Sequence, residues 1–174
     1  VYVTTLCLNA SQTIDDTILS VVTQAGDFVL RYHVQDGGSI DGTVARLVHW
    51  QELLAEPSSN LVRCRRVVFS FETRADSGLY DAVVRGFGNM SIADHAMMTW
   101  INSDDVLLPR TLETIVSIRD ESVAWCGGSI HTYCTRSKTP HSYSVLFNRE
   151  MIAAGLCDGR HWQMIQQEGC FFRR

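Results

Sequence analysis

The sequence predicts an α/β fold built on a mostly parallel sheet with helices on both faces. Short apolar, β-branched runs alternate along the chain with amphipathic helical segments, and this order gives parallel strands joined by helical crossovers. The 174 residues suit one domain, and no linker, repeat or low-complexity stretch divides them. Polar turns follow the apolar runs, and ligands bind beyond the carboxyl ends of the strands in such sheets.

The first half of the chain alternates most clearly. Its β-branched or apolar runs indicate strands, and the spacing of Ile14, Ile18 and Val21 indicates a helix with one apolar face. Ser11 can cap that helix, and Gly26 follows its end. We therefore expect strands over residues 1–8, 28–34 and 61–71, and helices over residues 11–24 and 43–54.

The second half begins with the same alternation and then becomes less regular. A helix is expected from residue 77 or 78 to about 86, and a strand over residues 97–101. Pro109 suits the first turn of a helix that carries Leu112, Ile115 and Ile118 on one face. Strand character returns over residues 123–130 and 143–147, on either side of a polar, irregular stretch at 135–141.

Charge and hydropathy exclude two classes of partner. The formal net charge is −4, so no field attracts polymeric nucleic acid or an anionic membrane. No apolar run approaches the ~20 residues that span a bilayer, and the sequence shows no basic start followed by a short apolar core and a small-residue cleavage site. Small phosphorylated ligands remain possible, because a bound metal ion can supply local positive charge.

Six scattered cysteines indicate the redox compartment. None forms a Cys-x-x-Cys pair, which argues against a zinc site, because zinc is typically held by closely paired ligands. Free, partly buried thiols in a reducing compartment are expected, and hence a cytoplasmic domain. The cysteines are Cys7, Cys64, Cys126, Cys134, Cys157 and Cys170.

A glycine turn, Asp36-Gly37-Gly38-Ser39-Ile40-Asp41-Gly42-Thr43, follows the second strand. At the strand end, the Asp36 carboxylate can accept a hydrogen bond from a ligand such as a pyrimidine ring N–H. The glycines permit close backbone approach, and Ser39 and Asp41 can accept from free amides at the helix start. The alternative is a plain structural turn. The dinucleotide fingerprint lacks its third glycine here, and no P-loop Gly-Lys-Ser/Thr follows.

A second polar segment, Asn102-Ser103-Asp104-Asp105, comes where the strand over 97–101 ends. Two carboxylates held close together repel one another unless a cation lies between them or one is protonated. Mg²⁺ and Mn²⁺ prefer oxygen ligands and often use one or two carboxylates plus substrate phosphates. Asn102 can add a hydrogen bond to a sugar. The alternative is a polar turn in which Asp104 or Asp105 caps the following helix.

These motifs, taken together, resemble family 2 glycosyltransferases of the GT-A fold. The resemblance covers almost the whole chain, with the motifs in the family's order and at its approximate spacing. It rests on Cys7–Ala10, Asp36–Thr43, Asp76–Ala82 and Asn102–Asp105, and on Gln166–Arg174, which resembles the family's acceptor-side segment.

The resemblance implies a Rossmann-like GT-A sheet and one role for each matching residue. Residues 1–174 would form a single catalytic domain, truncated at its C-terminus, with a nucleotide-sugar half over 1–105 and an acceptor half over 106–174. The metal, Mn²⁺ or Mg²⁺, would be held on the diphosphate by Asp105, and Glu168 would be the catalytic base. The nucleotide-sugar donor would be bound by Asn9, Asp36, Asp76, Asn102 and Asp104.

Other residues admit more than one interpretation. Tyr80 and Asp81 match a family motif, but they also suit a core aromatic residue and a local hydrogen-bonder. Asp158 and His161 are weaker candidates for the base, and Arg173 or Arg174 can pair with phosphate or be solvated. Val84 and Arg85 stand where many relatives have a polar Asn-Lys-like pair.

The function implied by the resemblance is inverting sugar transfer. A nucleoside-diphosphate sugar, with a UDP-sugar favoured, would donate to a hydroxyl of a saccharide or lipid-linked acceptor in polysaccharide or glycolipid synthesis. Such an enzyme would be cytoplasmic, or peripheral to the inner face of the membrane. Two alternatives are a sugar-nucleotidyltransferase and a non-catalytic nucleotide-sugar-binding module. The first fits poorly, because the turn Asn9–Gln12 has no glycine, lysine or arginine to grip a triphosphate.

Overall fold

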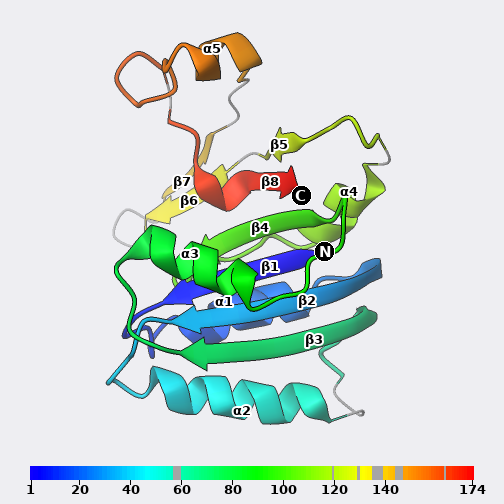
Figure 1. The fold of residues 1–174 in the computed structure, drawn as a ribbon, viewed down its shortest axis with the longest axis vertical. Helices are drawn as coiled ribbons and strands as arrows, with labels where there is room; N and C mark the ends of the chain where they lie inside the picture. Colours follow the sequence, from blue (N-terminus) through cyan, green and yellow to red (C-terminus); the bar gives the residue numbers. More distant parts are fainter. Residues whose placement is uncertain (57–59, 119, 129, 135–138, 144–146, 163) are drawn as a thin grey trace.

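The computed structural model describes residues 1–56, 60–118, 120–128, 130–134, 139–143, 147–162 and 164–174. In these residues a six-stranded sheet has the order β3-β2-β1-β4-β8-β5, and β6 and β7 form a separate hairpin (Figure 1). The strands are β1 (Tyr2–Cys7), β2 (Gly26–Asp36), β3 (Cys64–Thr73), β4 (Met97–Asn102), β5 (Trp125–Gly127), β6 (Ile130–Cys134), β7 (Thr139–Tyr143) and β8 (Cys170–Arg173). The helices are α1 (Ile14–Val22), α2 (Thr43–Ala55), α3 (Leu79–Gly88), α4 (Thr111–Ser117), α5 (Arg149–Ala153) and the 3₁₀ turn η1 (Gln167–Gly169).

Strand directions confirm a mostly parallel sheet. β3, β2, β1 and β4 are parallel neighbours, whereas β8 runs antiparallel to both β4 and β5. Because the four parallel strands end together, the loops that follow β1, β2, β3 and β4 lie along one edge of the sheet. Both motifs predicted from the sequence are in these loops.

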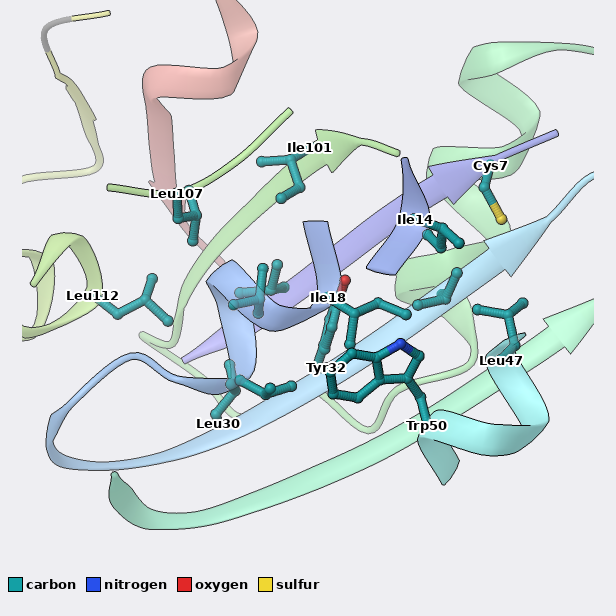
Figure 2. Packing of buried hydrophobic residues seen from close by; sticks show 14 of the residues in the cluster. Cys7, Ile14, Ile18, Leu30, Tyr32, Leu47, Trp50, Ile101, Leu107 and Leu112 are labelled. Carbon is teal, nitrogen blue, oxygen red and sulfur yellow. The ribbon is translucent and has the colours of Figure 1, made fainter. Parts of the chain in front are cut away.

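An apolar core fills the face of the sheet behind the strands in Figure 1, where α1 lies. Ile14 and Ile18 of α1 and Leu47 of α2 are fully buried there against β1 and β2. Figure 2 shows Trp50 of α2 in the same cluster, and its indole N–H donates to Asp15 at 2.9 Å. Each large side chain buried in this way contributes roughly 1.5–3 kcal/mol of transfer free energy.

The other face is covered by α3, which lies in front of the strands in Figure 1, so the sheet has helices on both faces as predicted. Beneath α3 the sheet is polar, since it presents Thr4, His33 and Gln35, all buried. A Cβ atom on Gly86 would lie 2.3 Å from Cγ2 of Thr4, so this helix packs closer than any side chain would allow.

Several predicted elements differ from the observed ones. Ser11 does not cap α1, because the helix begins at Ile14 and Thr13 takes the N-cap position. The Ser11 backbone N–H donates to Asp41. Pro109 precedes α4 and does not lie in its first turn, and Arg110, with φ 67°, separates the two. The strand expected over 123–130 is divided between β5 and the start of β6, and residues 144–146 of the strand expected over 143–147 lie outside the described residues. Neither α5 nor β8 was predicted.

The structure also bears on membrane spans and on the state of the cysteines. In the part that the structure describes, no helix is long and apolar enough to cross a membrane. The thiols of Cys7, Cys64, Cys126, Cys157 and Cys170 are free. The side chain of Cys134 lies outside the described residues.

Candidate active site

The loops that follow β1 and β2 are joined by hydrogen bonds from both sides. Asn9 adopts a left-handed conformation with φ 53°, and its N–H donates to Ser39 Oγ at 2.7 Å. In return, its side-chain oxygen accepts from the Ile40 N–H at 2.9 Å. Ser11 N–H donates to Asp41 at 3.0 Å. The two loops therefore form one rigid rim at the carboxyl edge of the sheet.

Asp36 lies under this rim and is completely buried. Its carboxylate accepts from the backbone N–H groups of Gly38 and Ser39 at 3.2 and 3.0 Å, from the Ser39 hydroxyl and, at 3.6 Å, from the Cys7 thiol. Burial, followed by the charge of Asp36, raises the pKa of Cys7, so this thiol is not a nucleophile. The Asp36 carboxylate thus holds the glycine turn, and its predicted contact with a nucleotide base would need one of these donors to move.

Asp76 is more accessible and lies next to the same turn. One carboxylate oxygen accepts from the Gly78 N–H at 2.9 Å. The other oxygen, Asp76 Oδ2, lies close to Gly37: a Cβ atom added to this glycine would be 2.8 Å from Oδ2 and 3.5 Å from Leu8 Cδ1. The Leu8 side chain is 61% exposed. An apolar side chain, an open glycine backbone and a carboxylate oxygen therefore adjoin at this edge.

The end of β4 brings together the second set of predicted residues. Asp105 is half-buried, and its carboxyl group lies beside that of Glu168. Burial, the charge of Glu168 and the charge of Asp104 together raise the pKa of Asp105 to about 6, while a hydrogen bond with Asn102 opposes the rise. Asn102 also donates to Glu168 Oε1 at 3.4 Å. The predicted base and the predicted metal ligand are therefore neighbours.

Glu168 reaches this position because of β8. The turn η1 precedes β8, and the Thr99 hydroxyl of β4 donates to the Cys170 carbonyl at 2.8 Å. On the other side, the Gly128 N–H donates to the Gly169 carbonyl at 2.8 Å. Gln167 donates to Glu168 Oε1 at 2.6 Å. Glu168 is thus held from both neighbouring strands beside the carboxyl end of β4.

This arrangement fits a divalent cation that is shared with a ligand. Asp104, Asp105 and Glu168 crowd negative charge, which a cation would relieve. Among the described residues, however, no three His, Cys, Asp or Glu side chains converge as ligands of one ion. Any Mg²⁺ or Mn²⁺ held here would therefore need further oxygen ligands, such as the phosphate oxygens of a bound substrate.

The remaining acceptor-side candidates for the base are engaged elsewhere. Asp158 accepts from the backbone N–H groups of Arg160 and His161, each at 2.9 Å, and from the His161 ring at 3.0 Å. These bonds lower the pKa of Asp158 to about 2, and both side chains of the pair are exposed. The structure gives this pair a local role within its loop.

The first turn of α3 carries one residue with a structural role, Asp81, and one exposed residue, Tyr80. Asp81 accepts from the Ser77 N–H at 2.9 Å and pairs with Arg85 at 2.8 Å, which is the local role expected as its alternative. Tyr80 is 78% exposed, so the alternative interpretation of a core aromatic residue is wrong. Val84 is also exposed, on the surface of the same helix.

Arg173 has a role that was not predicted. It pairs with Met97 at the start of β4, which is the edge of the sheet opposite the carboxylates, so phosphate pairing does not fit. Its guanidinium instead donates to backbone carbonyls on separate segments, those of His95, Ile118, Asp120 and Val123. Only tertiary structure brings these carbonyls together.

The comparisons with known proteins agree with this fold. A family model described as glycosyl transferase family 2 matches residues 2–174, and the chain belongs to this family. A comparison with the curated proteins gave no match.

Solved structures of S. aureus TarS share the fold of this chain. Residues 1–349 of TarS align with a TM-score of 0.51 and 19% identity, over 71% of this chain and 33% of that one. The same TarS segment in complex with UDP aligns with a TM-score of 0.50 and 18% identity, over 71% and 32%. The chain therefore spans about a third of the length of these TarS structures, and the likeness is one of GT-A fold.

Proposed function

We propose that the chain is the catalytic domain of an inverting, metal-dependent glycosyltransferase that uses a UDP-sugar. The observation that carries this proposal is the meeting of Asp105 and Glu168 at the carboxyl end of β4. Membership of glycosyl transferase family 2 supports the reaction class. The chemistry requires one group beside the leaving diphosphate and another beside the acceptor hydroxyl, and these two carboxylates suit that division.

The nucleotide would lie along the loops that follow β1, β2 and β3. The Leu8 side chain and the open backbone of Gly37 offer an apolar wall to a base, and Asp76 Oδ2 offers an acceptor to a base or ribose. Asn9 and Asp36 would support this wall through the hydrogen-bonded rim. The solved complex of a structurally similar TarS segment with UDP favours uridine.

Asp105, with Asp104 beside it, would hold Mn²⁺ or Mg²⁺ against the diphosphate. When bound, the cation supplies positive charge that offsets the charge developing on the leaving group. Asn102 would orient the sugar nucleotide and also holds Glu168 in place through its amide.

Glu168 would act as the general base. The acceptor hydroxyl oxygen attacks the anomeric carbon on the face opposite the nucleoside diphosphate, and its proton passes to the Glu168 carboxylate. The bond from the anomeric carbon to the diphosphate oxygen breaks, so configuration at that carbon is inverted. Such general-base assistance contributes on the order of 10²–10⁴-fold to a rate.

The acceptor would be a saccharide or a lipid-linked saccharide, in polysaccharide or glycolipid synthesis. The free thiols of the described cysteines support a reducing compartment, and hence a cytoplasmic site of action, at the inner face of a membrane where the acceptor is lipid-linked.

Calorimetric titration with UDP, GDP and dTDP, each with and without Mn²⁺, tests the proposal. We expect UDP to bind most tightly, and its affinity to fall without metal and in Asp105→Ala. Glu168→Gln should retain UDP binding and lose transfer by at least about 10²-fold. Asp158→Asn, which changes an acidic residue of a neighbouring loop, is the matched control.

Two results would contradict the proposal in different ways. If none of the nucleotides binds, the donor site does not exist in this chain. If UDP binds but Glu168→Gln turns over like the unchanged protein, Glu168 is not the base, and absence of any transfer would favour the binding-module alternative.

A further inference from the structure

On β4 and β5, the face of the sheet that α3 covers carries two tryptophans, Trp100 and Trp125. Trp125 of β5 pairs with Phe172 of β8, and Met98 of β4 pairs with the same residue, so these three side chains share one face. Phe172 contacts Phe87 of α3, with ring centroids 5.9 Å apart, which identifies this face as the one under α3. Trp100, two residues after Met98, lies on it as well.

The Trp125 indole is held in one position along β5. A Cβ atom on Gly127 would lie 3.2 Å from the indole, so the ring rests over that glycine. Gly127 pairs with Cys170 on the neighbouring strand, so the ring also lies beside the Cys170 side chain. Even so, the residue is 37% exposed. A large apolar ring is thus fixed by its neighbours and left open on one side.

This ring lies close to the carboxylate that would act as the base. Cys170, which lies beside Trp125, follows Glu168 by two residues in the chain. Burial, followed by the negative charge of Glu168, raises the pKa of the Cys170 thiol to about 11. Glu168 in turn contacts Asn102 and Asp105. Along the face, therefore, an exposed indole adjoins Cys170, and Cys170 adjoins the proposed base on the side away from the nucleotide loops.

We propose that Trp125 binds the sugar ring of the acceptor by stacking, and so helps to select a pyranose acceptor. This inference rests on the proposed function and names the acceptor's chemistry. The face of an indole is negative and apolar, and it suits the C–H groups on one face of a pyranose ring. A hydroxyl of that ring would then lie at Glu168. A linear polyol has no such flat face and would gain less from the contact.

Kinetics on variants of Trp125 separate this role from donor binding. Transfer from a UDP-sugar to methyl pyranosides and hydrolysis of the UDP-sugar by water are both measured for Trp125→Ala and Trp125→Phe. We expect Trp125→Ala to raise the KM for the pyranoside about tenfold, with Trp125→Phe in between. UDP affinity and hydrolysis of the donor should stay within about twofold of the unchanged protein. Trp50→Phe, in the core behind the sheet, is the control.

A direct binding measurement completes the test. Titration with methyl pyranosides should quench tryptophan fluorescence in the unchanged protein and in Trp50→Phe, but not in Trp125→Phe, and glycerol should quench in none. An unchanged pyranoside KM in Trp125→Ala, or equal quenching in Trp125→Phe, would overturn the proposal. If UDP itself fails to bind the unchanged protein, the proposed function fails instead.

Discussion

Asp105 and Glu168 come from opposite halves of the chain, and their carboxyl groups lie beside one another at the carboxyl end of β4. Their environments differ, since Asp105 directly follows Asp104 in the turn after β4, whereas Glu168 accepts from Asn102 and Gln167. Paired carboxylates in different surroundings can take different roles in one reaction. In the proposed reaction, Asp105 would serve the donor side and Glu168 the acceptor side.

Gly86→Ala should destabilise the fold, because the new Cβ would lie 2.3 Å from Thr4 Cγ2 and α3 would have to move away from the sheet. We expect a loss of roughly 1–3 kcal/mol in the free energy of unfolding, measured in urea. Gly88→Ala meets nothing within 4 Å and should cause no loss. The double variant Thr4→Ser with Gly86→Ala should recover stability, since serine lacks Cγ2. Equal behaviour of the two glycine variants would refute this packing.

Asp36→Asn and Asp76→Asn should separate a structural carboxylate from a ligand-binding one. At Asp36 the amide would face donors from Gly38 and Ser39, and the unpaired groups should cost about 1–3 kcal/mol. Asp76→Asn should lower the free energy of unfolding less, because the described hydrogen bond of Asp76 is the single one from the Gly78 N–H. We expect it to leave stability within ~0.5 kcal/mol and to weaken UDP binding instead. Urea unfolding and calorimetry on the same samples distinguish the two effects.

Arg173→Lys should be costly although the charge is kept. A lysine ammonium cannot reach the carbonyls of Val123, His95 and Ile118 together, so some would lose their donor. We expect a loss of about 2 kcal/mol in the free energy of unfolding. Arg174→Lys is the control, with an expected loss under ~0.5 kcal/mol in the free energy of unfolding. The Arg174 side chain is 57% exposed, and its ion pair with Asp94 is long, at 3.9 Å between Nη1 and Oδ1. A similar loss in both variants would mean that the carbonyl contacts are unimportant.

His33 should make stability depend on pH. Asn89 Nδ2 can only donate, so the ring nitrogen that it contacts at 3.3 Å is an unprotonated acceptor, and the other nitrogen contacts Ser70 at 2.9 Å. Burial lowers the pKa of His33 below the ordinary 6.5, although Gln35 and Glu72 oppose this. The unfolded chain therefore binds the proton first as the pH falls below 6.5, and stability is lost there but not above it.

The variant His33→Gln isolates this contribution. The difference in free energy of unfolding between the unchanged protein and His33→Gln should be constant from about pH 8 to 6.5 and should shrink below it. Groups such as Asp105, whose raised pKa acts in the opposite sense, are common to both proteins and cancel. A difference that does not vary with pH would show that His33 titrates alike in the folded and unfolded chain.

The sequence was sufficient for the parallel half of the sheet because its signals are local. Each strand from β1 to β4 is an apolar run followed by a polar turn, and α1 repeats its apolar side chains at helical spacing. The ends of the helices were predicted less accurately, because a helix cap depends on hydrogen-bond partners that lie elsewhere in the sequence. Ser11, for example, resembles a helix cap but gives its N–H to a loop on the next strand.

The acceptor side could not be predicted in the same way. β8 has four residues, too few for a periodic pattern, and its place between β4 and β5 depends on antiparallel pairing with strands distant in sequence. Family resemblance identified Glu168, but the position of Trp125 beside Cys170 arises only from that pairing. Likewise, the burial of Asp36 under the Asn9 rim required the two loops to be seen together.

The position of β8 also constrains the order in which the protein can assemble during synthesis. Residues of β4 and β5 leave the ribosome well before Phe172 of β8, with which both strands pair. Until then, each strand has an edge without a hydrogen-bonded neighbour. Chains are made from the N-terminus at about 5–20 residues per second, which leaves those edges open for several seconds. The parallel half can fold in that interval, but Glu168 meets Asp105 only after it. A chaperone that shields the edge of β4 would therefore act in the interval before Glu168 meets Asp105.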